Sequence, residues 1–287
     1  MLKTATSNPI RRRDLCLAGF LLAGGTRLAK GQKDAGFRPL FDGKSLSGWT
    51  PKVRDPKNPS LGRWTVEDGV IIGGQDPPGS GLGAYLVSDE AFGDFELQIE
   101  ARPDWPADTG ILVRTIPEGN IGFQCLLDHR PHGGIGGYYG NGMVLAGFHA
   151  WEYGFTGEKD AEGRLVRLVP EPPSEPNPQN NVPLDFAAPA EVFLRIWKVG
   201  GWNHFRIRCV GELPRFTTWI NGEKISELDT AKIKMPKYDP QKVLQVLGRT
   251  GHISLEVHSN GANDKLGKDR WAPGAVCRWR NISIKTL

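Results

Sequence analysis

Ionisable side chains follow directly on an alternating run near the middle of this 287-residue sequence. The ionisable residues are Asp128, His129 and Arg130. A carboxylate and an imidazole at the end of a strand can act as a general base, a general acid or metal ligands. Glycine pairs at 133–134 and 136–137 come next, and glycines allow another group to approach closely. Residues 122–151 are therefore the first candidate for a functional site.

Strand alternation predicts which of these side chains share a face. It places Gln124, Leu126 and Asp128 on one face. His129 then points to the opposite face unless the strand has already ended. The alternative is that Asp128 is a turn or cap residue and that His129 is a partly exposed packing residue.

Aromatic residues accompany the glycine-rich loop. An aromatic ring beside a histidine can stack on the face of a sugar ring, and a buried aromatic anchor is the alternative. We expect a sugar to be bound by Arg130, Tyr138, His149 and Trp151. The loop lacks the G-x-x-x-x-G-K-[ST] pattern and the G-x-G-x-x-G spacing, so its glycines do not predict nucleotide binding.

A second polar face is predicted within residues 251–261. Alternation places Ser254, Glu256 and His258 together, opposite three apolar side chains. This face is either solvated or functional. Glu256 would add a second carboxylate to a site that contains His258.

The elements that position these residues are predicted to be strands. Residues 95–101, 205–209 and 276–285 alternate, and Asn221-Gly222 between two β-rich runs is the strongest short hairpin signal. Many short strands separated by turn residues indicate an all-β, two-sheet antiparallel sandwich. The proline-rich segments 51–61 and 168–189 should not form regular central strands, and the second is either a lid or a linker. Residues 232–243 should form a short helix or an edge strand.

An ordered series of motifs resembles one known family. The series comprises F-x-P-L-F-D-G-K-x-L-x-G-W at 37–49, G-D-F-x-L-x-x-E-x-R at 93–102, T-G-I-L-V-R at 109–114 and G-x-I-x-L-E-x-H at 251–258. Over residues 37–287 the chain resembles the 3-keto-disaccharide hydrolase family. The resemblance implies a concanavalin A-like jelly roll whose concave sheet carries the site.

The resemblance also implies a chemistry. Members of the family act on glycosides whose sugar is oxidised to a ketone at C3, so that a base can remove the C2 proton, the C1 substituent leaves by β-elimination, and water adds to the enone. Such a site needs a base, stabilisation of the enolate oxygen and a proton donor. We expect these catalytic roles to fall to Asp128, His129, Glu256 and His258.

Arg114, which ends the T-G-I-L-V-R motif, could hold a sugar oxygen or an enolate. Its alternative is a structural ion pair, for example with Glu96 or Glu100. No cofactor is firmly indicated, although a divalent metal ion could polarise the ketone, with Asp128 and His129 as candidate ligands.

Two other functions stay open. The same fold could serve as a lectin-like carbohydrate-binding module without catalysis. A conventional retaining glycosidase of this fold would need an E-x-D-x-E strand, and residues 158–162 fit that spacing formally. Their flanking glycines instead predict a charged hairpin tip.

The charge distribution indicates export and argues against nucleic acid. The first 31 residues carry six basic side chains against Asp14, so the rest of the chain holds about −1 of the net charge of +4, with no basic stripe for phosphates. Arg12-Arg13 before the apolar run 15–23 resembles a twin-arginine signal, and that run is too short to cross a bilayer. We therefore expect an export signal over residues 1–31, a single domain over residues 32–287 without a transmembrane span, and a periplasmic or extracellular location.

Three cysteines remain after the predicted signal, namely Cys125, Cys209 and Cys277. None has C-x-x-C spacing, so structural zinc is not expected. All three lie in strand-like runs, which favours buried free thiols, and a Cys209–Cys277 disulfide is the alternative.

Overall fold

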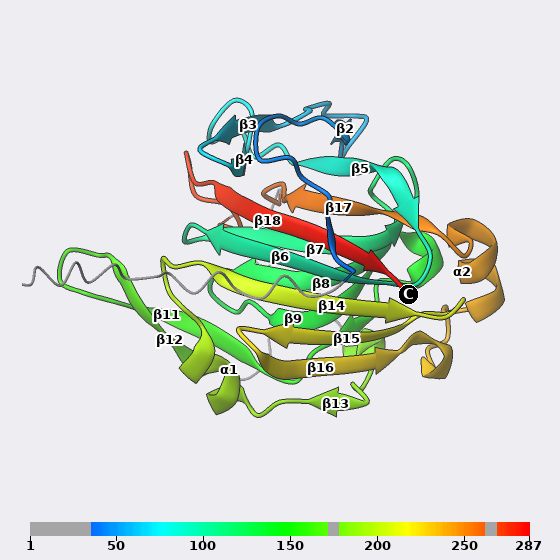
Figure 1. Ribbon diagram of the computed structural model, residues 1–287. Coiled ribbons are helices and arrows are strands. Elements are labelled where there is room, and N and C mark those ends of the chain that lie inside the picture. The colour runs from blue at the N-terminus through cyan, green and yellow to red at the C-terminus, as the bar shows by residue number, and fades with distance from the viewer. Residues whose placement is uncertain (1–35, 172–177, 262–268) are drawn as a thin grey trace, which may run out of the picture. The chain divides into compact units, whose positions relative to one another are not determined.

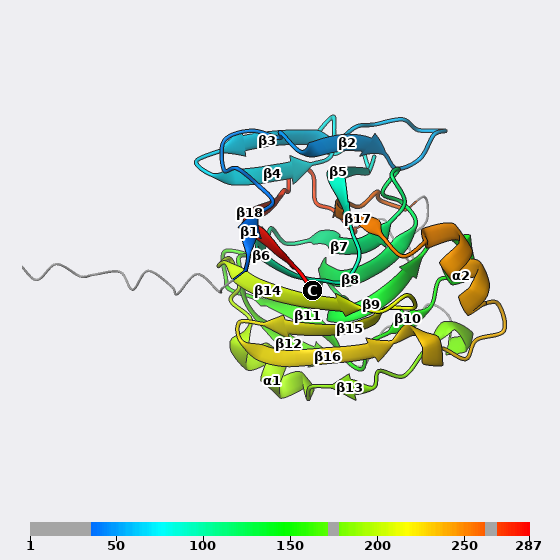
Figure 2. The same cartoon turned by 45° about the vertical axis from the view of Figure 1, so that its right-hand side comes forward.

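Two antiparallel β-sheets form two layers in the computed structural model (Figures 1 and 2). The structure describes residues 36–171, 178–261 and 269–287, and the unit that contains them runs from Gly36 to Leu287. The predicted export signal over residues 1–31 lies outside the described residues. None of the described helices has the length and hydropathy needed to cross a membrane.

The larger sheet follows the order β13 (Phe186–Ala187), β16 (Glu223–Asp229), β15 (Arg215–Ile220), β14 (Asn203–Val210), β6 (Phe95–Pro103), β18 (Cys277–Thr286), β4 (Val70–Gly74) and β3 (Arg63–Glu67), and β1 (Arg38–Pro39) also pairs with β18. The smaller sheet follows the order β10 (His149–Ala150), β9 (Ile135–Asn141), β8 (Gly122–His129), β7 (Ala107–Thr115), β17 (Gly251–Val257), β5 (Ala84–Phe92) and β2 (Trp49–Val53). A separate hairpin joins β11 (Gly154–Lys159) to β12 (Leu165–Glu171). The helices are α1 (Ala190–Ile196) and α2 (Pro240–Leu247), with 3-10 turns η1 (Met143–Leu145), η2 (Pro178–Asn180) and η3 (Thr230–Lys232).

The core lies between the two sheets because every second side chain of the central strands is apolar. Leu97 and Ile99 of β6 and Ile207 of β14 come from the larger sheet, and Ile111 of β7 and Leu255 of β17 come from the smaller one. All five are fully buried. The opposite faces of β7, β8 and β17 are thereby left free to carry polar side chains.

The predicted jelly-roll sandwich is confirmed, as is its strongest local signal. Asn221 and Gly222 connect β15 to β16 with positive φ angles of 50° and 93°, the backbone that a two-residue hairpin turn requires. The twist of this turn matches the twist of the strands it joins.

Proline governs the irregular segments as expected. Pro51 lies in β2, the edge strand of the smaller sheet, where a missing N–H is tolerated. The segment 232–243 contains the start of α2, so the short-helix alternative is confirmed. The first residue of α2 is Pro240, and the side chain of the N-cap residue Asp239 accepts from two backbone N–H groups. The segment 168–189 enters β12 before residues 172–177, which lie outside the described residues, and later contributes η2 and β13.

The structure also decides between free thiols and a disulfide for the described cysteines. Cys125, Cys209 and Cys277 are free and buried, so the Cys209–Cys277 disulfide does not form. Burial raises the pKa of the Cys125 and Cys209 thiols to about 12, which keeps both in the unreactive thiol form.

Replacing Gly222 with Ala should test the hairpin. No atom lies within 4 Å of an added Cβ, so the cost is that of holding a Cβ residue at φ 93°, about 1 kcal/mol in the free energy of unfolding. Gly93→Ala is the matched control, since its Cβ would meet neighbours only at 3.8 Å and its φ is not positive. Urea unfolding that shows equal midpoints for the two variants would contradict this interpretation.

Candidate functional site

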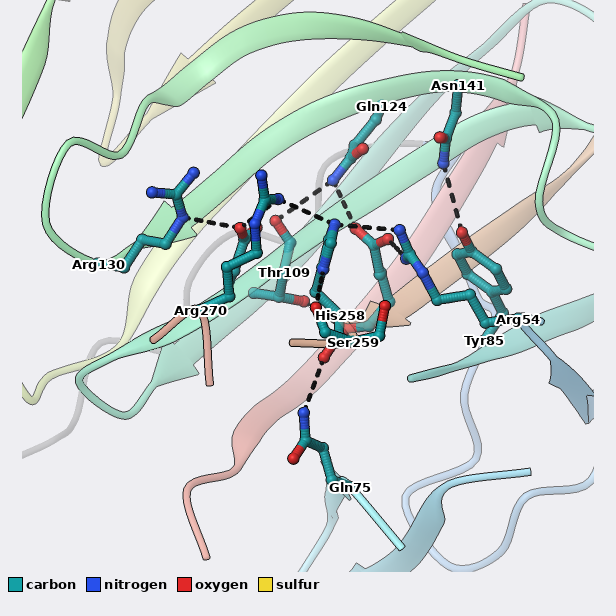
Figure 3. Close-up of polar contacts among 12 residues, drawn as sticks. Arg54, Gln75, Tyr85, Thr109, Gln124, Arg130, Asn141, His258, Ser259 and Arg270 are labelled. Carbon is teal, nitrogen blue, oxygen red and sulfur yellow. Dashed lines mark hydrogen bonds and ion pairs between the residues drawn. The ribbon is translucent and has the colours of Figure 1, made fainter. Parts of the chain in front are cut away.

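Polar side chains gather on the face of the smaller sheet that points away from the core (Figure 3). They come from three neighbouring strands and from segments that follow or precede strands. The members of this polar face are Arg54, Asp108, Gln124, Asp128, Arg130, Glu256, His258 and Arg270. Alternation is the local cause, because the residues between them on β7, β8 and β17 fill the core.

Two carboxyl groups face each other at the centre of this arrangement. Asp108 of β7 and Asp128 of β8 are direct cross-strand partners, and their side chains are only 1% and 8% exposed. Arg130 donates from Nε to Asp108 Oδ2 at 2.7 Å, and Arg270 donates to the same oxygen at 2.9 Å. Both guanidinium groups therefore pair directly with Asp108.

This asymmetry drives the pKa values of the two carboxyl groups apart. Burial would raise the pKa of Asp108, but the positive charges of His258 when protonated, Arg130 and Arg270 outweigh burial and lower it. For Asp128, burial and then the negative charge of Asp108 raise the pKa well above the ordinary value. Asp128 Oδ1 is buried and has no hydrogen-bond partner among the described residues. Such a carboxyl group is suited to proton transfer.

A second set of contacts surrounds His258. Its Nε2 lies 3.0 Å from an Arg54 nitrogen and 3.0 Å from an Arg270 nitrogen. Arg54 also pairs with Glu256, which is fully buried and accepts from Gln124 Nε2 at 2.6 Å. The prediction that Glu256 and His258 share a face is confirmed.

Aromatic rings extend the polar face toward β10. The ring of Tyr139 lies 4.9 Å from that of His149, which lies 4.7 Å from that of Trp151. Burial and the charge of Arg270 lower the pKa of His149 to about 4, so this imidazole is neutral at neutral pH. His149 Nδ1 has no hydrogen-bond partner among the described residues.

The glycine-rich loop is explained by close packing of the backbone. A Cβ at Gly133 would lie 1.9 Å from the carbonyl oxygen of Asp128, and one at Gly137 would lie 2.6 Å from the Trp151 side chain. The glycines thus let the chain turn tightly after Asp128 and let Trp151 approach β9.

His129 does not join the site, and the expectation that it shares chemistry or a metal ion with Asp128 is wrong. Because β8 continues through His129, its imidazole points to the opposite face, where it packs against Trp105 and Trp197. Its Nδ1 donates to the Asp104 carbonyl at 2.8 Å, and burial lowers its pKa to about 4. Within the described residues no group of three or more His, Cys, Asp or Glu side chains could hold a metal ion, and the two candidate ligands, Asp128 and His129, point to opposite faces of the sheet.

Arg114 is also absent from the polar face, which corrects its predicted role in sugar binding. Its φ of 53° interrupts the alternation of β7, and the side chain is 2% exposed. The guanidinium pairs with Asp94 at 3.1 Å and donates to backbone carbonyls of Gly211 and Arg249. Arg114 therefore forms the structural ion pair that was the alternative prediction, but its partner is Asp94 in place of Glu96 or Glu100.

Tyr138 is the third correction. It is fully buried between the sheets, where its hydroxyl lies 2.5 Å from Thr218 Oγ1 and its ring stacks on Phe216. The neighbouring Tyr139, one residue along the strand, points to the polar face instead. The charged motif 158–162 lies at the tip of the β11–β12 hairpin, where Glu158 pairs with Arg167 in solvent.

Besides Tyr139, three residues of the site were missed by the sequence analysis. Asp108 directly precedes the T-G-I-L-V-R motif, and antiparallel pairing of β7 with β8 could have placed it opposite Asp128. Arg54 follows β2 in a proline-rich segment, and Arg270 precedes β18 in an irregular one, so no periodicity marks either residue.

Replacing Asp128 with Asn should stabilise the protein at alkaline pH. A carboxyl group whose folded pKa is raised contributes stability below its unfolded pKa and loses it as pH rises through the folded pKa, whereas Asn carries no such penalty. One pKa unit is about 1.4 kcal/mol, which corresponds to about 3–5 °C in Tm for a domain of this size.

Thermal melts between about pH 4 and about pH 9 measure this effect, which should be small at acid pH and grow with pH. Asp160→Asn is the control, because that carboxyl group lies in the turn between β11 and β12, away from the site, and has a lowered pKa. A variant at position 128 whose Tm equals or falls below that of the wild type at every pH would contradict the assigned pKa direction.

Comparisons with known proteins identify the family. A family described as 3-keto-alpha-glucoside-1,2-lyase-like domain matches residues 36–285. No curated protein matched the chain. Among solved structures, the chain is similar to a "putative glycosyl hydrolase" from Parabacteroides distasonis ATCC 8503 at 17% identity, covering 88% of this chain and 94% of that chain with a TM-score of 0.47. It is also similar to the carbohydrate-binding module CBM66 from Bacillus subtilis at 10% identity, covering 83% and 96% with a TM-score of 0.38. The match to residues 36–285 spans nearly all of the described unit, so the chain belongs to the 3-keto-alpha-glucoside-1,2-lyase-like family and is a carbohydrate-active protein.

Proposed function

We propose that this protein is an enzyme that cleaves 3-keto-glycosides, including 3-keto-disaccharides, with Asp128 as the base that removes the C2 proton. The observation that carries the proposal is the Asp108–Asp128 pair, in which the guanidinium groups of Arg130 and Arg270 bind Asp108 directly, while burial and Asp108 raise the pKa of Asp128. Membership of a family named for lyase chemistry on 3-keto-glucosides supports the substrate class.

The reaction begins at the carbon next to the ketone. Removal of the C2 proton sends the electron pair of the C2–H bond toward the ketone oxygen and forms an enolate. The electrons return to form a C1–C2 double bond, the C1–O bond breaks, and the leaving alkoxide takes up a proton. Water then adds across the double bond of the enone, so that the overall result is hydrolysis.

Asp128 suits the first step better than the imidazoles do. A base is most effective when its pKa approaches the working pH, and burial together with Asp108 raises the pKa of Asp128 in that direction. The pKa of His149 falls to about 4 and that of His258 to about 3, mainly through burial. After accepting the C2 proton, Asp128 becomes the acid that can return it to the leaving oxygen.

The aromatic side chains beside the acid pair supply the sugar-binding surface in this proposal. Tyr139, His149 and Trp151 form a continuous series of ring contacts on the same face. Aromatic rings pack against the C–H groups of pyranose rings. Arg130 acts through its pairing with Asp108, and no step is assigned to a metal ion.

The proposal includes the route to the substrate. The twin-arginine-like segment over residues 1–31 would direct the folded protein out of the cytoplasm, to the periplasm or the medium. A carbohydrate substrate would then be met outside the cell.

Asp128→Asn should lower kcat on 4-nitrophenyl 3-keto-glucoside by at least about 100-fold, because the amide cannot accept the C2 proton. Release of nitrophenol measures turnover, and sugar binding should change little since shape and polarity are kept. Glu158→Gln and Glu162→Gln are the controls, because both residues lie on the exposed hairpin.

Two outcomes would contradict this assignment. Wild-type protein that binds 3-keto-glucosides without releasing nitrophenol would be a carbohydrate-binding module. Turnover of unoxidised glucosides that is lost in the Glu158 or Glu162 variants would indicate a conventional retaining glycosidase.

Asp108→Asn should move the acid limb of the kcat/KM profile to lower pH, by at least about one unit. The substitution removes a negative charge that raises the pKa of Asp128 and leaves Arg130 and Arg270 to lower it. Activity requires ionised Asp128, so it rises with pH through this pKa. The profile should be unchanged in Asp160→Asn, and an acid limb that stays in place or moves to higher pH in Asp108→Asn would exclude Asp128 as the titrating base.

A further inference from the structure

We propose that His258 is a positioning residue that holds the guanidinium groups of Arg54 and Arg270 together, and that these two groups form a binding site for an anionic ene-diolate. The inference deepens the proposed function and rests on it for the identity of the anion, which would be the enolate formed when C2 loses its proton. Figure 3 shows Arg54 and Arg270 on either side of the His258 ring.

The hydrogen bonds of His258 fix its tautomer. Nδ1 lies 2.6 Å from the Ser259 carbonyl oxygen, which can only accept, so Nδ1 carries the proton. Nε2 then holds the lone pair and accepts from Arg54 and Arg270, both at 3.0 Å. Guanidinium groups can only donate, and therefore the nitrogen that would act as a base is already occupied twice.

Each arginine is anchored from its other side by a buried carboxylate. Arg54 pairs with Glu256, which Gln124 orients at 2.6 Å, and its guanidinium lies 5.4 Å from the centre of the Tyr85 ring. The imidazole is thus one of several contacts that define the position of Arg54. The charge of Arg54 is held on the polar face rather than in solvent, since only 19% of the Arg54 side chain is exposed.

Arg270 is anchored through both its backbone and its side chain. The Asp108 N–H donates to the Arg270 carbonyl at 2.8 Å, and Arg270 donates to Asp108 Oδ2 at 2.9 Å. The neighbouring residue, Trp271, forms a bridge with Ala107 at the start of β7. Arg270 is consequently fixed beside the carboxyl pair although it lies outside the regular strands.

The balance of charge favours an anion at this place. Three guanidinium groups, those of Arg54, Arg130 and Arg270, face two paired carboxylates, Asp108 and Glu256. When Asp128 takes the C2 proton, its negative charge is replaced by that of the enolate oxygen. The surrounding charge of about +1 then acts on the enolate, and fixed charges on largely buried side chains stabilise it strongly.

Ascorbate is a suitable probe because it is a sugar-derived ring that carries an ene-diolate anion at neutral pH. Isothermal titration should show that Arg54→Gln and Arg270→Gln each weaken ascorbate binding by at least about 10-fold. Binding of neutral methyl glucoside should change by less than about 2-fold in the same variants. Arg206→Gln is the matched control, because Arg206 pairs with Glu96 on the larger sheet.

Two amide substitutions at His258 separate positioning from catalysis. Gln places its oxygen near the position of Nε2 and can accept from both arginines, whereas Asn reaches only to the position of Nδ1. His258→Gln should keep ascorbate affinity, turnover and the pH profile close to those of the wild type, and His258→Asn should lose at least about 10-fold in both affinity and kcat. His252→Asn on β17, the strand that His258 follows, is the control, since its Nδ1 also meets a backbone carbonyl but no contact of its ring with either arginine is formed among the described residues.

The outcomes separate this inference from the proposed function. Arginine-dependent ascorbate binding without turnover of 3-keto-glucoside would support the anion site and overturn the enzyme. Turnover with ascorbate binding that is absent, or unaffected by the arginine substitutions, would overturn the anion site alone. Equal loss of turnover in His258→Gln and His258→Asn, with ascorbate affinity unchanged and folding intact by thermal melt, would make His258 a catalytic base and overturn its positioning role.

Discussion

The register between β7 and β8 is the constraint on which the site depends. It sets Asp108 directly opposite Asp128, and two buried carboxyl groups at that separation cannot both be ionised without compensation. Arg130 and Arg270 hydrogen-bond directly to Asp108, and their charges lower the pKa of Asp128 by less than burial and Asp108 raise it. A shift of the register by one residue would turn Asp128 toward the core, so the sheet itself determines the proton affinity of this group.

The sequence was most informative where a strand repeats with a period of two. Residues 95–101 and 205–209 became parts of β6 and β14, and alternation correctly placed Glu256 with His258 and separated His129 from Asp128. The physical reason is that burial of one sheet face imposes a pattern on every central strand. That pattern is visible in the sequence of each strand and can be recognised without knowing which strands pair.

The remaining features depend on contacts that local patterns do not encode. Arg114 would share the polar face by alternation, but its left-handed backbone redirects the guanidinium toward Asp94. Tyr138 and Tyr139 are adjacent and identical in type, and only the pairing of β9 decides which one faces the core. Arg54 and Arg270 reach the site from segments without periodicity, so their roles appear only when distant parts of the chain are brought together.

The site has two parts, one on regular strands and one on irregular segments, and the two parts should differ in their tolerance to substitution. Asp128, the proposed base, lies on a central strand, where backbone hydrogen bonds on both sides hold it, and substitution nearby disturbs the core. The cations come from an edge-strand extension and an irregular segment, which can vary without breaking a sheet. Contacts with Glu256, His258 and Asp108 fix the positions of the Arg54 and Arg270 guanidinium groups, although the segments that carry these arginines are irregular. In the proposed function, substrate charge can therefore be matched by changes in the loops while the carboxyl pair, and with it the proposed base, stays fixed by the strands.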